Sequence, residues 1–293
     1  MLRNAIERRI HGISGLALGG IDYSQPPGDP GLFGPGSMVW RVHGDFTSML
    51  CGGVSALLLQ MMHPLALAGV WDHSNFRDDM LGRLRRTSQF VAATSFGPTA
   101  DAERLIERVI SIHRHVTGTY TDGRAYRADD PELLTWVHVS EARSFLAGCL
   151  RYYQTELSIE EQDRYYRESA LTAYRLGATW VPETVGEVEA YLERMRPELI
   201  VDARTREVVR LLWAGSPQFR QVRLFYRLFL RGGADLLPDW AQDALELRAS
   251  PAGRRATRAS VNTLAPVLRW AVRDGARARA TARMSAADAS ESR

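Results

Sequence analysis

The sequence predicts an all-α fold in a single multi-helix domain. Three observations predict it: apolar residues recur at helical spacing through most of residues 38–281, helix start and stop signals flank these segments, and no run alternates in the manner of a strand. The chain has 293 residues and a hydrophobic share of 45%. It is therefore long enough to bury a core and has the composition of an ordinary globular protein.

The first 37 residues predict a short amphipathic helix at 4–9 and a loop rich in Pro and Gly at 20–37. Arg8 and Arg9 also resemble the start of a twin-arginine export signal, but Glu7 precedes the pair and no clear cleavage site follows. We therefore predict a cytoplasmic protein, with export or membrane association as the alternatives.

The segment Met49–Val70 is strongly apolar and long enough to cross a bilayer. However, Pro64 lies inside it, and a proline bends or ends a helix because it lacks the backbone N–H. We predict a buried central helix over Met49–Met62, bent or ended at Pro64. A membrane span is the alternative.

The remaining elements follow from local signals. Gly97-Pro98 precedes a helix that starts at Thr99, and Ser158 with Glu161 forms a capping box. Asp122-Gly123 predicts a turn between short hairpin strands. We expect helices near 45–62, 76–92, 99–117, 131–156, 159–178, 184–196, 202–213, 217–231, 238–248 and 251–281. Residues 282–293 are small and polar and predict a disordered tail.

The charged residues exclude several chemistries. The chain contains no lysine, so all 37 basic residues are arginine, and a P-loop lysine, a Schiff-base lysine and a Ser-Lys dyad are ruled out. A net charge of +3 gives no argument for a nucleic-acid partner. Cys51 and Cys149 are far apart in apolar surroundings, which predicts two buried free thiols.

The histidines are the natural place to look for a cofactor ligand: His11, His43, His63, His73, His113, His115 and His138. No HExxH, Glu-x-x-His, nucleophile elbow or Gly-rich phosphate loop occurs. His113 and His115 stand two apart on one predicted helix, so they point to nearly opposite faces. His113 continues the apolar stripe and His115 the polar one. An inward histidine is either a hydrogen-bonded core residue or a single axial ligand of the kind haem iron takes.

A second group of residues lies on one face of the preceding helix. Arg83, Arg86 and Thr87 are spaced i, i+3 and i+4, with Asp79 one turn before Arg83. This group is either a solvated face with a surface ion pair or the border of a binding site. Because Phe90 continues the same stripe toward the core, the two guanidinium groups would need anionic partners there.

These motifs, taken together and in order over residues 40–230, resemble the rubber-oxygenase family of latex-clearing proteins and mycophenolic-acid oxygenase-like proteins. The matching residues are Gly44-Asp45, Leu58-Leu59-Gln60, His63-Pro64, Gly69-Val70, His73-Ser74-x-Phe76, Gly82-Arg83-Leu84-x-Arg86-Thr87, Ile112-His113 with Val116-x-Gly118, and Trp136-Val137-His138. The resemblance implies a globin-like helical core around one haem b. It implies His113 as the proximal ligand and Arg83, Arg86 and Thr87 on the distal side.

The chain departs from that family at one position. Latex-clearing members carry a lysine where this chain has Arg86. Arginine does not lose its proton, so it cannot ligate iron as a lysine can. The resemblance then implies a sixth iron position that is empty or held by water or another side chain. Cleavage of polyisoprene itself is not implied.

Three further histidines have a structural and a functional interpretation each. His63 is expected to be a core histidine bonded to a free carbonyl, rather than a ligand. His73, between Asp72 and Ser74, is expected to cap or lock its helix. His138 either touches the haem or packs beside Trp136, and we include it among the candidate cofactor-binding residues.

The function predicted from the sequence is a haem-dependent oxygenase that acts with O₂ on a hydrophobic small molecule. Arg86 and Thr87 are the predicted catalytic residues, and Arg83 the predicted propionate clamp. One alternative is a non-enzymatic haem or gas-binding protein of globin type. Another is a helical protein without a cofactor, in peripheral contact with a membrane. The sequence does not define the oligomeric state.

Overall fold

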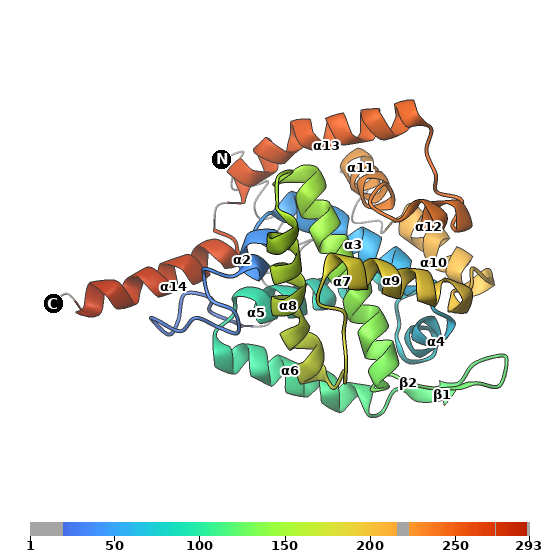
Figure 1. The fold of residues 1–293 in the computed structure, drawn as a ribbon, viewed down its shortest axis with the longest axis horizontal. Coiled ribbons are helices and arrows are strands. Elements are labelled where there is room, and N and C mark those ends of the chain that lie inside the picture. The colour runs from blue at the N-terminus through green and yellow to red at the C-terminus, as the bar shows by residue number, and fades with distance from the viewer. Residues whose placement is uncertain (1–19, 216–222, 273, 292–293) are drawn as a thin grey trace.

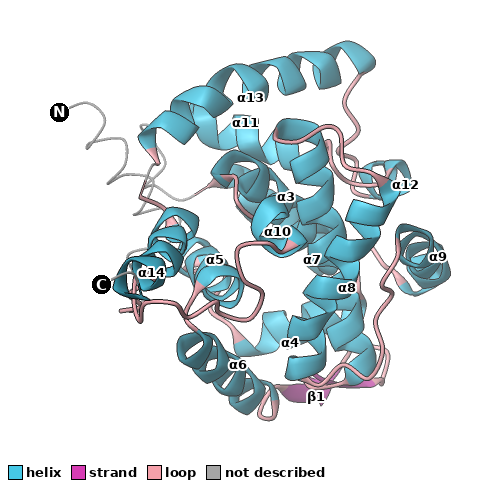
Figure 2. Ribbon diagram, turned by 60° about the vertical axis from the view of Figure 1, so that its left-hand side comes forward, coloured by secondary structure: helices cyan, strands magenta, loops and turns pink. Residues whose placement is uncertain are grey.

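The computed structural model describes residues 20–215, 223–272 and 274–291, and within them the chain is all-α apart from one small hairpin (Figures 1 and 2). The helices are α2 Met38–Val42, α3 Phe46–Gln60, α4 Pro64–His73, α5 Met80–Phe96, α6 Thr99–His113, α7 Pro131–Tyr152, α8 Ile159–Leu176, α9 Val185–Met195, α10 Ala203–Ala214, α11 Arg223–Ala234, α12 Asp239–Ala244, α13 Pro251–Ala271 and α14 Ala276–Glu291. The predicted fold class is confirmed. The expected helix at 4–9 and the Arg8-Arg9 pair lie outside the described residues.

The antiparallel pair α3 and α7 forms the centre of the molecule (Figure 1). The two helices approach closely because glycines lie between them. A Cβ atom at Gly148 would come within 2.6 Å of the Ser48 carbonyl oxygen, and one at Gly52 within 3.0 Å of the Ser144 carbonyl oxygen. Cys51 and Cys149 are both buried and free, as predicted. An apolar sequence thus becomes a core helix by packing its small residues against a second helix.

The central helix ends where the proline predicts. The chain bends by 102° between α3 and α4, and His63 is the N-cap residue before Pro64. Among the described residues, no single helix is long and apolar enough to cross a membrane; the bent pair α3 and α4 passes that test by length and composition alone. The Nδ1 atom of His63 accepts a hydrogen bond from the Ala66 N–H at 3.4 Å. His63 is therefore a helix cap, and the expected bond from its ring to a free carbonyl is wrong.

The predicted hairpin forms from β1 Thr117–Thr119 and β2 Ala125–Arg127, with Gly123 in the turn at φ +92°. It lies against α4, and the Tyr126 hydroxyl donates to Asp72 at 2.7 Å. The hairpin explains why α6 ends at His113 and not at residue 117 as expected. His73, at the end of α4, lies 3.0 Å from the Thr117 carbonyl oxygen through its Nε2 atom and so joins the two elements.

The C-terminal region differs from the sequence prediction. The single helix expected over 251–281 is two helices, α13 and α14, and α14 continues to Glu291 through the segment expected to be disordered. Arg283 explains this difference. Its side chain is fully buried and donates to the carbonyl oxygens of Asp29, Tyr23 and Phe96 at 2.7, 2.9 and 3.0 Å. The helix is thereby held against the loop that precedes α2, a long-range contact that local composition does not reveal.

Candidate functional site

The candidate site lies at the open end of the α5–α6 hairpin. Helix α5 begins after Asp79, whose carboxylate accepts from the Gly82 N–H at 2.8 Å, and ends at Gly97. Only Gly97 and Pro98 separate it from α6, and the two helices contact each other (Figure 2). A connection this short turns the chain back on itself. The start of α5, with Arg83, is therefore brought to the same end as His113, the last residue of α6.

His113 presents a half-buried imidazole without a partner. Its Nδ1 atom is buried, and within the described chain neither ring nitrogen has a hydrogen bond. Burial lowers its pKa, against a smaller opposing effect of Asp129. His115 is exposed, and its Nδ1 atom lies 2.8 Å from the Ser111 carbonyl oxygen. The two histidines thus lie on opposite sides of α6, as the periodicity predicts. Only His115 has a hydrogen-bond partner for its ring among the described residues.

Arg83 is a half-buried cation that forms no ion pair with any residue the structure describes. Burial lowers its pKa, and the nearby Arg86 lowers it further. The sequence shows Asp79 one helical turn before Arg83. In the structure the Asp79 carboxylate lies 3.8 Å from the Arg86 guanidinium instead, and these two side chains are 48% and 60% exposed. The i, i+4 spacing of Asp79 and Arg83 permits an ion pair between them but does not require one.

Arg86 and Thr87 lie on the solvent side of α5. Both are exposed, and the Thr87 hydroxyl donates to the Arg83 carbonyl oxygen at 3.2 Å. Their side chains flank Arg83 and do not enter the protein interior. The arrangement brings the three residues together on one surface of α5, at the end that also holds His113.

His138 lies on the central helix α7, in a more shielded position than His113. Burial lowers its pKa to about 4. In the described part of the chain no hydrogen bond or ion pair connects it to His113, Arg83 or Arg86. Its neighbour Trp136 is fully buried and donates from Nε1 to the Gln60 carbonyl oxygen at 3.3 Å. His138 therefore remains a candidate that the geometry does not connect to the other four.

The structure adds buried polar residues to which the sequence assigned no role. Glu141 follows His138 by one turn of α7 and contacts Gln60, and burial raises the pKa of its carboxyl to about 7. His43 lies 2.7 Å from the Ser95 hydroxyl and 2.9 Å from the Tyr165 hydroxyl, and burial lowers its pKa to about 3. The i, i+3 spacing of His138 and Glu141 was the available signal, but only the packing of α2, α5 and α8 brings the other groups beside α7.

Comparison with known proteins identifies the family. The model of the ER-bound oxygenase mpaB/B'/rubber oxygenase catalytic domain matches residues 40–270, which is well over half of the chain. The chain belongs to this oxygenase family. It is therefore an enzyme of the oxidoreductase class. No curated protein and no solved structure matched the chain.

The match to the mpaB/rubber oxygenase domain includes all of α3 to α12 and most of α13. Every candidate residue named above lies inside it. Helix α14, with the buried Arg283, lies beyond it. Within the described residues, no group of three or more His, Cys, Asp or Glu side chains is arranged to hold a metal ion.

Proposed function

We propose that this oxygenase is haem-dependent and uses O₂ to oxidise a hydrophobic small molecule, with His113 as the one side-chain ligand of haem b iron. The observation that carries the proposal is the unpartnered, half-buried imidazole of His113. Burial lowers the pKa of that ring and so favours its neutral form, which is the form that coordinates a metal. Haem brings its own iron and needs only axial ligands from the protein, so a single histidine suffices.

Arg83 supports the same cofactor. A half-buried guanidinium without a carboxylate is costly unless an anion binds to it. The carboxylates of a haem are anions of suitable size, and arginine binds a carboxylate through two parallel hydrogen bonds. Because Arg83 lies at the same end of the hairpin as His113, one planar ligand could contact both.

When bound, a haem would supply the redox chemistry with O₂. The chain supplies donors beside it. The Arg86 guanidinium stays protonated, so it donates hydrogen bonds to negatively charged oxygen atoms and does not compete for the metal. The Thr87 hydroxyl lies next to it and can orient a water molecule or pass on a proton. Partly buried apolar residues of the same helix, Leu84 and Val91, suit an apolar substrate.

The first test is the absorption spectrum of the purified full-length protein, with iron quantified per chain. We expect a Soret band and about one iron per chain in the parent. His113→Ala should lose both, because it removes the axial ligand. His115→Ala is the matched control on the same helix and should keep both. A normal Soret band in His113→Ala would show that the ligand is misassigned.

A second measurement distinguishes turnover from reversible gas binding, the alternative that the sequence left open. Membership in an oxygenase family favours turnover. We expect O₂ consumption by the haem-loaded protein to increase when apolar substrates are added. Retained haem without substrate-dependent O₂ consumption across a broad set of apolar compounds would favour the gas-binding function.

A further inference from the structure

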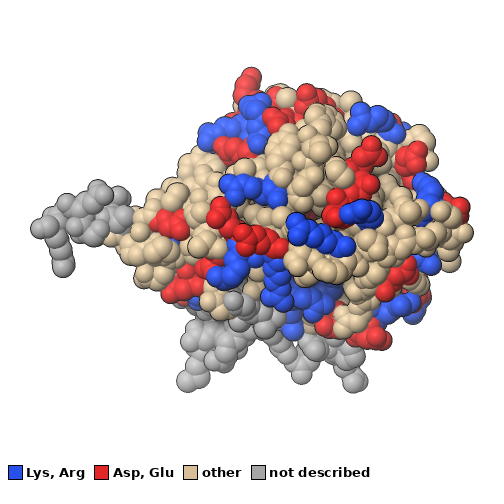
Figure 3. Space-filling model, turned by 90° about the horizontal axis from the view of Figure 1, so that it is seen from below, with Lys and Arg blue, Asp and Glu red and all other residues tan. Residues whose placement is uncertain are grey.

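Helices α11 and α13 form one end of the molecule and share an unusual composition. They pack against each other and against α3, and both lie at the top of Figures 1 and 2. Together they carry seven arginines and no acidic residue: Arg223, Arg227 and Arg231 on α11, and Arg254, Arg255, Arg258 and Arg269 on α13. Figure 3 shows the opposite end, where basic and acidic side chains are interspersed. Neither helix therefore carries a negative charge of its own, although Asp235 and Asp239 of the connection between them pair with arginines of α13.

Some of these arginines have structural partners. Arg254 and Arg258 bind Asp235, and Arg269 binds Asp45 at 2.6 Å. The other four, Arg223, Arg227, Arg231 and Arg255, are exposed and form no ion pair within the described residues. Three of them recur every fourth residue along α11, so they form a single row on its outer side.

The same two helices also carry exposed apolar side chains. Leu224 is 82% exposed and Phe225 44% on α11, while Val267 is 48% and Trp270 44% exposed on α13. Four of the nine large apolar side chains with high exposure in the described chain thus lie on these two helices. Arginine beside exposed Trp, Phe and Leu on a helix is typical of a surface that lies in the interface of a bilayer.

We propose that the α11–α13 face docks on an anionic lipid surface, with the arginine row on the phosphate groups and Leu224, Phe225 and Trp270 inserted between the lipids. Charge favours this occupant over a second copy of the chain, since two arginine rows of the same sign would repel each other. The exposed apolar side chains favour it over a nucleic acid, which would use the arginines alone. The proposal does not depend on the haem assignment.

The test is co-sedimentation of the full-length protein with vesicles of phosphatidylcholine alone or with about one third phosphatidylglycerol. We expect binding to the anionic vesicles, weaker binding at high salt because the charges are screened, and little binding to pure phosphatidylcholine. One basic residue near an anionic surface is worth about a fivefold change in partitioning. Arg227→Ser with Arg231→Ser should therefore weaken binding about twentyfold or more.

A matched control is Arg108→Ser with Arg167→Ser, two exposed arginines on α6 and α8 that form no ion pair in the described chain. It changes the net charge equally and should bind as the parent does. Leu224→Ser with Trp270→Ser should weaken binding without changing its salt dependence. Equal loss in the control pair, or equal binding to both kinds of vesicle, would overturn the proposal. So would a concentration-dependent dimer that the Leu224→Ser variant abolishes.

Discussion

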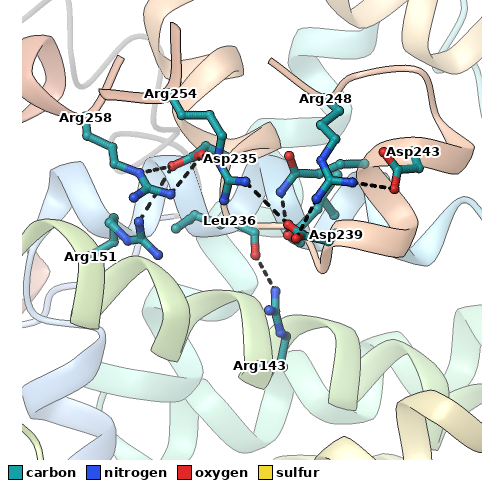
Figure 4. Close-up of polar contacts among 11 residues, drawn as sticks. Arg143, Arg151, Asp235, Leu236, Asp239, Asp243, Arg248, Arg254 and Arg258 are labelled. Atoms are coloured by element: carbon teal, nitrogen blue, oxygen red, sulfur yellow. Dashed lines mark hydrogen bonds and ion pairs between the residues drawn. The ribbon is translucent and has the colours of Figure 1, made fainter. Parts of the chain in front are cut away.

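Two regions of this protein hold arginines near the core and treat them in opposite ways. Directly after α11, the Asp235 side chain is 4% exposed and binds Arg254 at 2.7 Å and Arg258 at 2.6 Å, with Arg151 at 3.9 Å (Figure 4). At the open end of the α5–α6 hairpin, Arg83 is half-buried and has no carboxylate among the described residues. In the first region a carboxylate of the chain pairs with the arginines. In the second, no carboxylate of the described residues pairs with Arg83.

The difference indicates which arginines stabilise the fold and which are available to a ligand. The Asp235 group joins α13 to the α11–α12 turn and to α7, and Arg143 of α7 also donates to the Leu236 carbonyl oxygen (Figure 4). Arg283 is satisfied in another way, by backbone carbonyls alone. An unpaired cation like Arg83 costs folding free energy, so it is available to an anionic ligand of the kind proposed above.

The largest effect on stability is expected from Asp235→Asn. Removal of the one buried carboxylate leaves three guanidinium groups facing one another, and loss of one partner from a buried pair costs about 3–5 kcal/mol. We expect about 3 kcal/mol here, because the arginines are 25–37% exposed. Urea unfolding of the purified protein measures it. Asp243→Asn is the control: Asp243 is 53% exposed and binds Arg248 alone, so less than about 1 kcal/mol should be lost. Similar losses in both variants would contradict the comparison.

Glu141 shows how a buried acid without an arginine can be accommodated. Burial raises its pKa from 4.5 to about 7, so its folded form holds the proton more tightly than its unfolded form. Its stabilising contribution is complete below about pH 4.5 and is lost as the pH rises through about 7. Glu141→Gln removes this dependence. Relative to the parent, the variant should gain about 3 kcal/mol between pH 4.5 and pH 8.

Urea unfolding of the parent and of Glu141→Gln at both pH values tests this. The buried histidines His43, His63 and His138 have lowered pKa values, so they destabilise both proteins equally in acid and cancel in the difference. A difference that does not change with pH would show that Glu141 is charged in the folded protein.

Arg83→Leu should have a small effect on folding and a large one on the cofactor. Since Arg83 has no carboxylate to lose, the free energy of unfolding of the haem-free protein should change by less than about 1 kcal/mol, in either direction. Haem occupancy after purification should fall, because the variant cannot bind a propionate. Arg108→Leu, which replaces an exposed arginine of α6, is the control and should keep its haem. A loss as large as that of Asp235→Asn would mean that Arg83 is a structural residue.

The sequence was sufficient for features that depend on local signals. The end of α3 before Pro64, the Ser158 capping box and the opposite sides of α6 for His113 and His115 are all as expected. Contacts between distant segments were not accessible to it. Arg283 and Asp29 are 254 positions apart, which is why the order of α14 was missed. For the same reason the sequence indicated neither the contact of His43 with Tyr165 nor the arginine that Asp79 would approach.

The smallest effect on folding is expected from Arg86→Lys, and it tests the remaining arginine of the site. Because Arg86 is 60% exposed and its contact with Asp79 is 3.8 Å long, the free energy of unfolding should change by less than about 0.5 kcal/mol. The spectrum should change instead. A lysine loses its proton near pH 10 and can then bind iron, whereas arginine keeps its proton throughout. The haem-loaded variant should therefore become low-spin as the pH rises, and the parent should not. Identical spectra for both at high pH would place Arg86 away from the iron and leave it a residue of the solvated face of α5.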